Sequence, residues 1–219
     1  MKVLKDPQSG SAAGTTASRN RFGQYERTRA IPVNPNSTNQ GTVRNRLSVN
    51  SAAWRALTDA QRAGWAGLGA SITRTDALGQ TYTLQGNQAY ASINNNRAAC
   101  GLAVVADAPA IATPVGLATA TITLTAAAFS VAYTATPLPA ATYLMLFASP
   151  QRSAGRSFEG DFRLIAVTAA AAASPHNLLT AYTARFGVPV VGNKVFLNLV
   201  TVTLGFESGP FITSAIVSA

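Results

Sequence analysis

The sequence has very few of the residues on which most enzyme chemistry depends. Its 219 residues include one cysteine, one histidine and eight carboxylates. The single Cys100 excludes an internal disulfide and a zinc site with several cysteine ligands, so we interpret it as a small apolar core residue. A lone histidine, His176, is a poor basis for a metal site or a general base. We therefore predict a protein that is not an enzyme and has no metal or cofactor.

Charge is also scarce, and it is unevenly distributed. Charged residues make up 11% of the chain, against about 25% in typical soluble domains. Residues 1–40 and 41–100 each carry six cations and two anions, whereas residues 101–219 carry five and four. Fourteen of the seventeen cations are arginine, which forms bidentate contacts with carboxylates or phosphates. We favour an acidic protein surface as the partner over nucleic acid, because no zinc finger or aromatic nucleic-acid motif accompanies the arginines.

Long apolar runs are absent, although 47% of the residues are hydrophobic and can fill a core. No run approaches the roughly 20 residues that a membrane-spanning helix needs, so we expect no contact with a membrane. The first seven residues lack the continuous apolar segment of a signal peptide, so we expect none.

Residues 1–37 predict an extended basic arm. Residues 8–16 are rich in glycine, serine, alanine and threonine and favour flexibility, while two prolines at positions 32 and 35 exclude a helix. Forty extended residues span up to about 130 Å, several times the ~13 Å radius of a small domain. We interpret the arm as a strap that crosses a neighbouring subunit; a disordered tail is the alternative. If residues 18–29 form one strand, successive side chains point to opposite sides. One side would then carry the candidate contact residues Arg19, Arg21, Tyr25, Arg27 and Arg29, and the other side would carry Phe22.

Residues 38–106 predict a helical segment with a small hairpin. Ser37 or Thr38 can cap a first helix, whose apolar stripe would be Val43, Leu47, Ser51, Trp54 and Leu57. Thr58 to Gln61 matches a capping box and starts a second helix, which we expect to fray at Gly64, Gly67 and Gly69. We expect the two tryptophans, Trp54 and Trp65, to share one cluster. Residues 73–84 suggest a hairpin, and residues 87–99 suggest a third helix.

Residues 107–219 predict an antiparallel β-sandwich, so the fold class is mainly β with a small α region. Short apolar strands are expected at 121–125, 129–133, 143–148, 162–168, 195–203 and 211–217. The runs at 143–147 and 195–200 are apolar on both faces, so the helical segment or another copy should cover one face. A short helix should open at Ser174-Pro175, with His176 in its first turn, and end at Gly187. The charged loop 149–161, with Arg152 and Arg156, is either a contact tip or the solvated end of the sandwich.

Three parts of the sequence together resemble a known but uncharacterised family. The runs SRNRFGQY (residues 18–25), PVNPN (32–36) and WRALTDAQRAGW (54–65) are similar to a virion-associated family of tailed phages and prophages. The C-terminal part resembles a fibronectin type III or immunoglobulin-like sandwich. The resemblance implies a virion structural protein that is assembled in the host cytoplasm, and it supplies no catalytic residues.

The resulting hypothesis is a capsid decoration or cement protein in many copies. Its partners would be other copies of itself and other virion proteins, above all the capsid shell. The expected contact residues are Arg19, Arg21, Phe22, Tyr25, Arg27, Arg29, Arg152 and Arg156. A tail, neck or filament subunit is the alternative, and a nucleic-acid-binding protein that uses the arginine-rich arm ranks third. A carbohydrate-binding sandwich is a further alternative, although the exposed aromatic platform that it needs cannot be located from the sequence.

Overall fold

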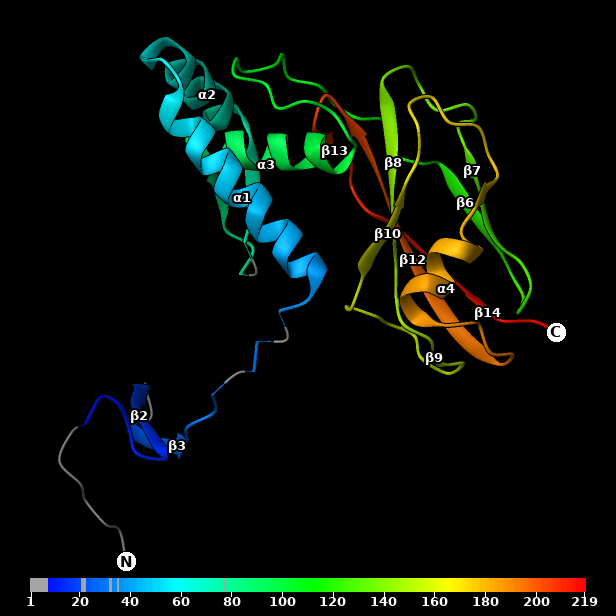
Figure 1. The fold of residues 1–219 in the computed structure, drawn as a ribbon, viewed down its shortest axis with the longest axis horizontal. Helices are drawn as coiled ribbons and strands as arrows, with labels where there is room; N and C mark the ends of the chain where they lie inside the picture. The colour runs from blue at the N-terminus through cyan, green and yellow to red at the C-terminus, as the bar shows by residue number, and fades with distance from the viewer. Residues whose placement is uncertain (1–7, 21–22, 32, 35, 77) are drawn as a thin grey trace, which may run out of the picture. The chain divides into compact units, whose positions relative to one another are not determined.

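The computed structural model describes residues 8–20, 23–31, 33–34, 36–76 and 78–219, and the chain divides into two compact units, 1–42 and 43–219. The described part is mainly β, with antiparallel sheets and four helices (Figure 1). Each unit is described separately below. No helix in the described part is long and apolar enough to cross a membrane.

The first unit contains a small three-stranded sheet. Its strands are β1 (Gly10–Ala12), β2 (Thr15–Asn20) and β3 (Gly23–Thr28), paired antiparallel in sequence order. Because Asn20 pairs with Gly23, the chain reverses between them. The prediction of a single strand over residues 18–29 is therefore wrong. Within the segment 8–16, for which we predicted flexibility, residues 10–12 lie in β1 and residues 15–16 in β2. Period-two alternation is the same in one long strand and in two paired ones, and Gly23, at a φ of 117°, permits the reversal.

Three helices and a hairpin begin the second part of the chain. The elements are α1 (Thr38–Ala56), α2 (Asp59–Ser71), β4 (Thr73–Thr75), β5 (Thr81–Thr83) and α3 (Gly86–Ala99). The capping box is confirmed, because the Thr58 side chain accepts a hydrogen bond from the backbone N–H of Gln61 and the Gln61 side chain accepts one from that of Thr58. The hairpin is also confirmed; the Asp76 carboxylate accepts hydrogen bonds from the backbone N–H groups of Leu78 and Gln80, both at 2.8 Å.

One glycine of α2, Gly69, is a close packing position, and the helix does not end early at its glycines as predicted. The helix continues to Ser71. A Cβ atom on Gly69 would lie 2.6 Å from the carbonyl oxygen of Leu84, and one on Gly86 would lie 2.9 Å from the backbone nitrogen of Ala66. Glycine therefore lets α2 approach the start of α3 closely, a role that glycine content alone does not distinguish from flexibility.

The tryptophans do share one cluster, and its centre is Tyr90 of α3. The Tyr90 ring lies 5.4 Å from that of Trp54 and 5.1 Å from that of Trp65. Trp65 is fully buried and donates a hydrogen bond from its indole to the carbonyl of Ala106. The predicted stripe of α1 is buried only towards its end, since Leu57 is buried but Val43 is 63% exposed.

Two antiparallel sheets form the rest of the second unit and share one core. The larger sheet has the order β10-β8-β12-β13, with β14 and β9 also paired to β12, and the smaller has the order β11-β7-β6. The core receives Phe129 and Val131 from the smaller sheet and Leu146 and Leu197 from the larger one. The strands are β6 (Thr119–Leu124), β7 (Phe129–Thr134), β8 (Thr142–Ala148), β9 (Arg152–Ser153), β10 (Arg163–Val167), β11 (His176–Asn177), β12 (Asn193–Thr203), β13 (Phe206–Glu207) and β14 (Phe211–Ile216).

The helical segment covers part of the outer face of the larger sheet. Met145, Val200 and Val202 lie on the opposite face from the shared core, and Ala99 and Cys100 at the end of α3 pack against them. From the sequence, either the helical segment or another copy of the protein could cover this face of the sheet. In the structure the helical segment covers part of it. Burial, with a smaller contribution from Glu207, raises the pKa of Cys100 to about 11, which fits an inert packing residue.

The short helix α4 (Leu179–Phe186) begins later than predicted. His176 lies in β11, opposite Val131, and so it is not in a helix. The Asn177 side chain accepts a hydrogen bond from the N–H of Leu179 at 2.9 Å, which offers the chain a helix start after the strand. The predicted end is confirmed, because Gly187 caps the helix at a φ of 85°.

Candidate functional site

The first candidate surface is the sheet β1–β3 within residues 8–42, whose described residues form no apolar core. None of the described residues in this range is buried. Tyr25 is 41% exposed, and Ile31 and Val33, which follow the sheet, are 74% and 89% exposed. Arg21 and Phe22 lie outside the described residues.

The sheet distributes the predicted arm anchors over two faces. Directly opposed residues of an antiparallel pair share a face, so Ser18 lies with Tyr25, and Thr16 lies with Arg27. Arg19 pairs with Gln24 and therefore lies on the other face. The prediction that Arg19, Tyr25 and Arg27 share one side is wrong, because the reversal after Asn20 exchanges the faces.

The loop arginines are held within the chain by a buried glutamate. Glu159 is 4% exposed, and its carboxylate accepts hydrogen bonds from the Arg152 guanidinium and, at 2.9 Å each, from the backbone N–H groups of Gly160 and Asp161. Arg156 forms a second ion pair with Glu159 at 3.4 Å. The hydrogen bond from Arg152 is the largest cause that lowers the pKa of Glu159 to about 2. These contacts hold the loop in one conformation and leave the Arg156 side chain 43% exposed.

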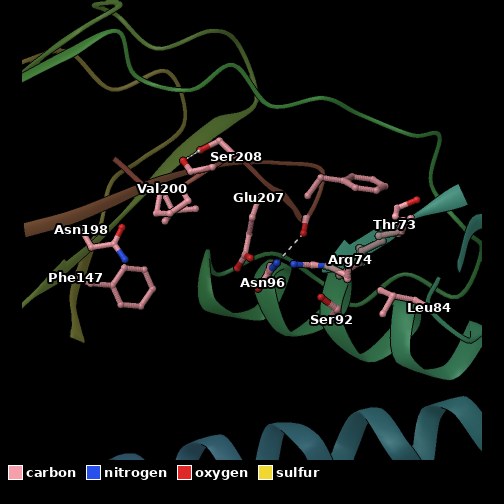
Figure 2. Close-up of a pocket in the computed structure, with 16 residues that line it drawn as sticks. Thr73, Arg74, Leu84, Ser92, Asn96, Phe147, Asn198, Val200, Glu207 and Ser208 are labelled. Atoms are coloured by element: carbon pink, nitrogen blue, oxygen red, sulfur yellow. Dashed lines mark hydrogen bonds between the residues drawn. The ribbon is translucent and has the colours of Figure 1, made fainter. Parts of the chain in front are cut away.

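The second candidate surface is a groove of about 580 Å³ in the second unit (Figure 2). Its walls come from the β4–β5 hairpin, from α3, and from β8, β12 and the segment after β12. One wall is fixed closely, since a Cβ on Gly205 would lie 2.7 Å from the Ile93 side chain, and Asn96 donates a hydrogen bond to the Gly205 carbonyl at 2.9 Å. Its lining residues include Arg74, Asn96, Phe147, Asn198, Phe206 and Glu207.

One buried polar atom in this groove has no partner. Asn198 Oδ1 is inaccessible to solvent and accepts no hydrogen bond from the described residues. The residue lies on the outer face of β12, directly opposite Phe147 of β8. In Figure 2 the charged ends of Arg74 and Glu207 both reach towards the part of the groove that contains Asn96. No hydrogen bond or ion pair within the described chain engages either charge.

Sequence reasoning missed the groove, because its residues come from four separate stretches of the chain. The one available signal was an asparagine inside the apolar run of β12. No group of histidine, cysteine, aspartate or glutamate among the described residues is arranged to hold a metal ion. Comparison with protein-family models, curated proteins and solved structures gave no match for this chain.

Proposed function

We propose that the protein is a structural component of a tailed-phage virion, a capsid decoration or cement protein whose residues 1–37 strap neighbouring subunits. The proposal rests on the sheet β1–β3 and the residues next to it, because none of the described residues in 8–42 is buried. Ordering a residue costs about 1–2 kcal/mol of backbone entropy, and small sheets need an apolar face packed on something to be stable. This unit therefore has reason to gain its stability on another molecule.

The charges of the arm favour a protein surface as that molecule. Arg19 and Arg27 lie on opposite faces of the sheet, so the unit can be held between two acidic surfaces, as a strap between subunits would be. The second unit would be the body that the strap anchors, and we propose that its two sheets form a sandwich of the fibronectin type III or immunoglobulin-like type. Their shared core supports this assignment.

Deletion of residues 1–36 tests the proposal. All the buried residues of the described chain lie in 43–219, so we expect the truncated protein to stay folded and soluble but not to join particles. A full-length variant with Tyr25→Ala and Arg27→Ala should join particles less well, while Thr28→Ala serves as the control on the opposite face. Incorporation of the truncated protein at the full level would contradict the strap.

The copy number in purified particles separates the proposed position from its alternatives. Quantitative mass spectrometry should find hundreds of copies per particle for a shell component. A dozen copies or fewer would point instead to a neck or tail component. DNA binding that weakens steeply with salt would favour the nucleic-acid alternative, because each phosphate contact releases counterions.

A further inference from the structure

The helix α1 has an apolar face that the described part of the second unit covers only towards its end. Val43, Leu47 and Trp54 follow one another at steps of four and seven residues, so their side chains lie on one face of the helix. Trp54 is in contact with α3, since its ring lies 5.4 Å from that of Tyr90. Val43 and Leu47 are 63% and 52% exposed. The first turns of this face are therefore open to solvent.

A second, smaller groove adjoins this open surface, where α1 crosses α3 (Figure 1). This α1–α3 groove has a volume of about 350 Å³, and Leu47, Trp54 and Tyr90 supply apolar walls. Asn50, which also lines it, donates a hydrogen bond to Asn95 of α3 at 2.9 Å and so ties the two helices together. Because Leu47 belongs to both the open face and the groove, the two form one continuous surface.

The charge of these two helices is of one sign. They contain Arg44, Arg46, Arg55 and Arg97 and no aspartate or glutamate. Arg44 and Arg55 are 11 residues apart, which is close to three full turns of an α-helix, so they lie in line along one edge of the apolar face. Arg55 also lines the groove. A molecule docked here would contact an apolar floor beside a cationic edge.

We propose that the α1–α3 groove binds an acidic amphipathic helix of another protein. Such a helix presents apolar side chains at the same three- and four-residue steps as α1, so it can cover Val43 and Leu47 and place one side chain in the groove. Carboxylates that flank its apolar face would pair with the arginines at the edge. The inference does not depend on the strap, because all of these residues lie in the second unit.

Two other occupants fit this surface less well. A second copy of this chain that docked through α1 would bring Arg44 and Arg55 against the same arginines, and like charges placed opposite each other oppose binding. A nucleic acid would satisfy the arginines with its phosphates, but it would leave Val43 and Leu47 against charged and hydrated groups.

Titration of the full-length, ¹⁵N-labelled protein with three synthetic peptides tests the proposal by NMR. Each peptide has about 18 residues, which is long enough to form a helix. The first has leucine at heptad positions a and d and glutamate at e and g; the second has lysine in place of the glutamates, and the third has serine in place of the leucines. The first should shift the signals of groove residues with a Kd of about 100 μM, and the other two should bind about tenfold more weakly.

Two substitutions on α1 separate the proposed face from the rest of the helix. Leu47 and Val49 are both 52% exposed, but they are about 200° apart around the helix axis. Leu47→Ser should weaken binding of the glutamate peptide about tenfold. Val49→Ser is the matched control and should leave binding unchanged. Because both side chains are exposed, neither change should abolish folding.

A charge reversal tests the cationic edge. Arg55→Glu should weaken binding of the glutamate peptide about threefold and strengthen binding of the lysine peptide by a similar factor, since exposed ion pairs are individually weak. Arg74→Glu, at an exposed position of the β4–β5 hairpin, makes the same change of charge away from the groove and should alter neither.

Absence of groove shifts with the glutamate peptide would overturn the proposal, and so would equal binding of the glutamate and lysine peptides. Equal losses for Leu47→Ser and Val49→Ser would also contradict it. Groove signals that change when the protein alone is diluted would identify a second copy as the occupant instead. Shifts with a short DNA duplex and with none of the peptides would identify a nucleic acid.

Discussion

Residues 8–42 and residues 43–219 both contain antiparallel sheets, yet only the second range has an interior. The sheets of 43–219 bury Val131, Leu146 and Leu197 completely, and the neighbouring helices bury Trp65. The sheet of 8–42 has similar backbone pairing but no buried residue among those described. Backbone hydrogen bonds contribute little net stability in water, so the difference lies in buried apolar side chains. The comparison separates a unit that has an apolar core of its own from one whose described residues form none.

The largest expected effect on stability comes from replacing one aromatic residue in each region. Trp65→Ala should lower the free energy of unfolding by about 3–5 kcal/mol, because it leaves a cavity and the carbonyl of Ala106 without its donor. Tyr25→Ala should change it by less than about 0.5 kcal/mol in the isolated protein. Chemical denaturation of the full chain measures both values. A comparable loss for Tyr25→Ala would show that the arm packs on the body.

A smaller effect is expected from two glycines of α2 that differ in their surroundings. Gly69→Ala should destabilise the protein by about 1–3 kcal/mol, because its Cβ would clash with the Leu84 carbonyl. Gly67→Ala meets open space in the same helix and should stabilise it by about 0.5–1 kcal/mol. Thermal melting of both variants checks the opposite signs. Equal effects would mean that α2 and α3 are not in close contact.

The smallest expected effect concerns the charged loop of the body. Because the pKa of Glu159 is lowered from 4.5 to about 2, its interactions stabilise the folded state above pH 4.5, and this contribution is lost as the pH falls towards 2. Glu159→Gln should therefore melt at a lower temperature than the wild type at pH 7, and the gap should narrow between pH 4.5 and pH 2. A gap that is the same at both pH values would show that the charge of Glu159 is not involved.

Local sequence patterns predicted most of the helices and strands. They failed where the structure depends on contacts between residues that are far apart in the sequence. The capping box at Thr58 and the stop at Gly187 were predictable, because each depends on side chains within a few residues. The run Asn94-Asn95-Asn96 lies inside α3, although asparagine has a low helix propensity. In the structure Asn94 bonds to the backbone of Val105, Asn95 to Asn50 and Asn96 to Gly205, partners that are 11 or more residues away along the chain.

The candidate sites show the same division. The basic arm was visible in the sequence, since composition alone shows where arginines gather, but the faces on which they lie depend on the reversal between β2 and β3. The predicted contact residues Arg152 and Arg156 turned out to hold Glu159, which no local pattern indicated. The groove could not be predicted, because Arg74, Asn198 and Glu207 meet only through packing.

By itself the sequence determined the order of basic arm, helical segment and β-rich region, because charge, capping residues and apolar alternation act over a few neighbouring positions. Only the tertiary structure decided which apolar faces are covered, which arginines are paired and where Asn198 is left without a partner. Those outcomes depend on which distant surfaces exclude water from one another, and burial of that kind is a property of the packed chain rather than of any segment in it.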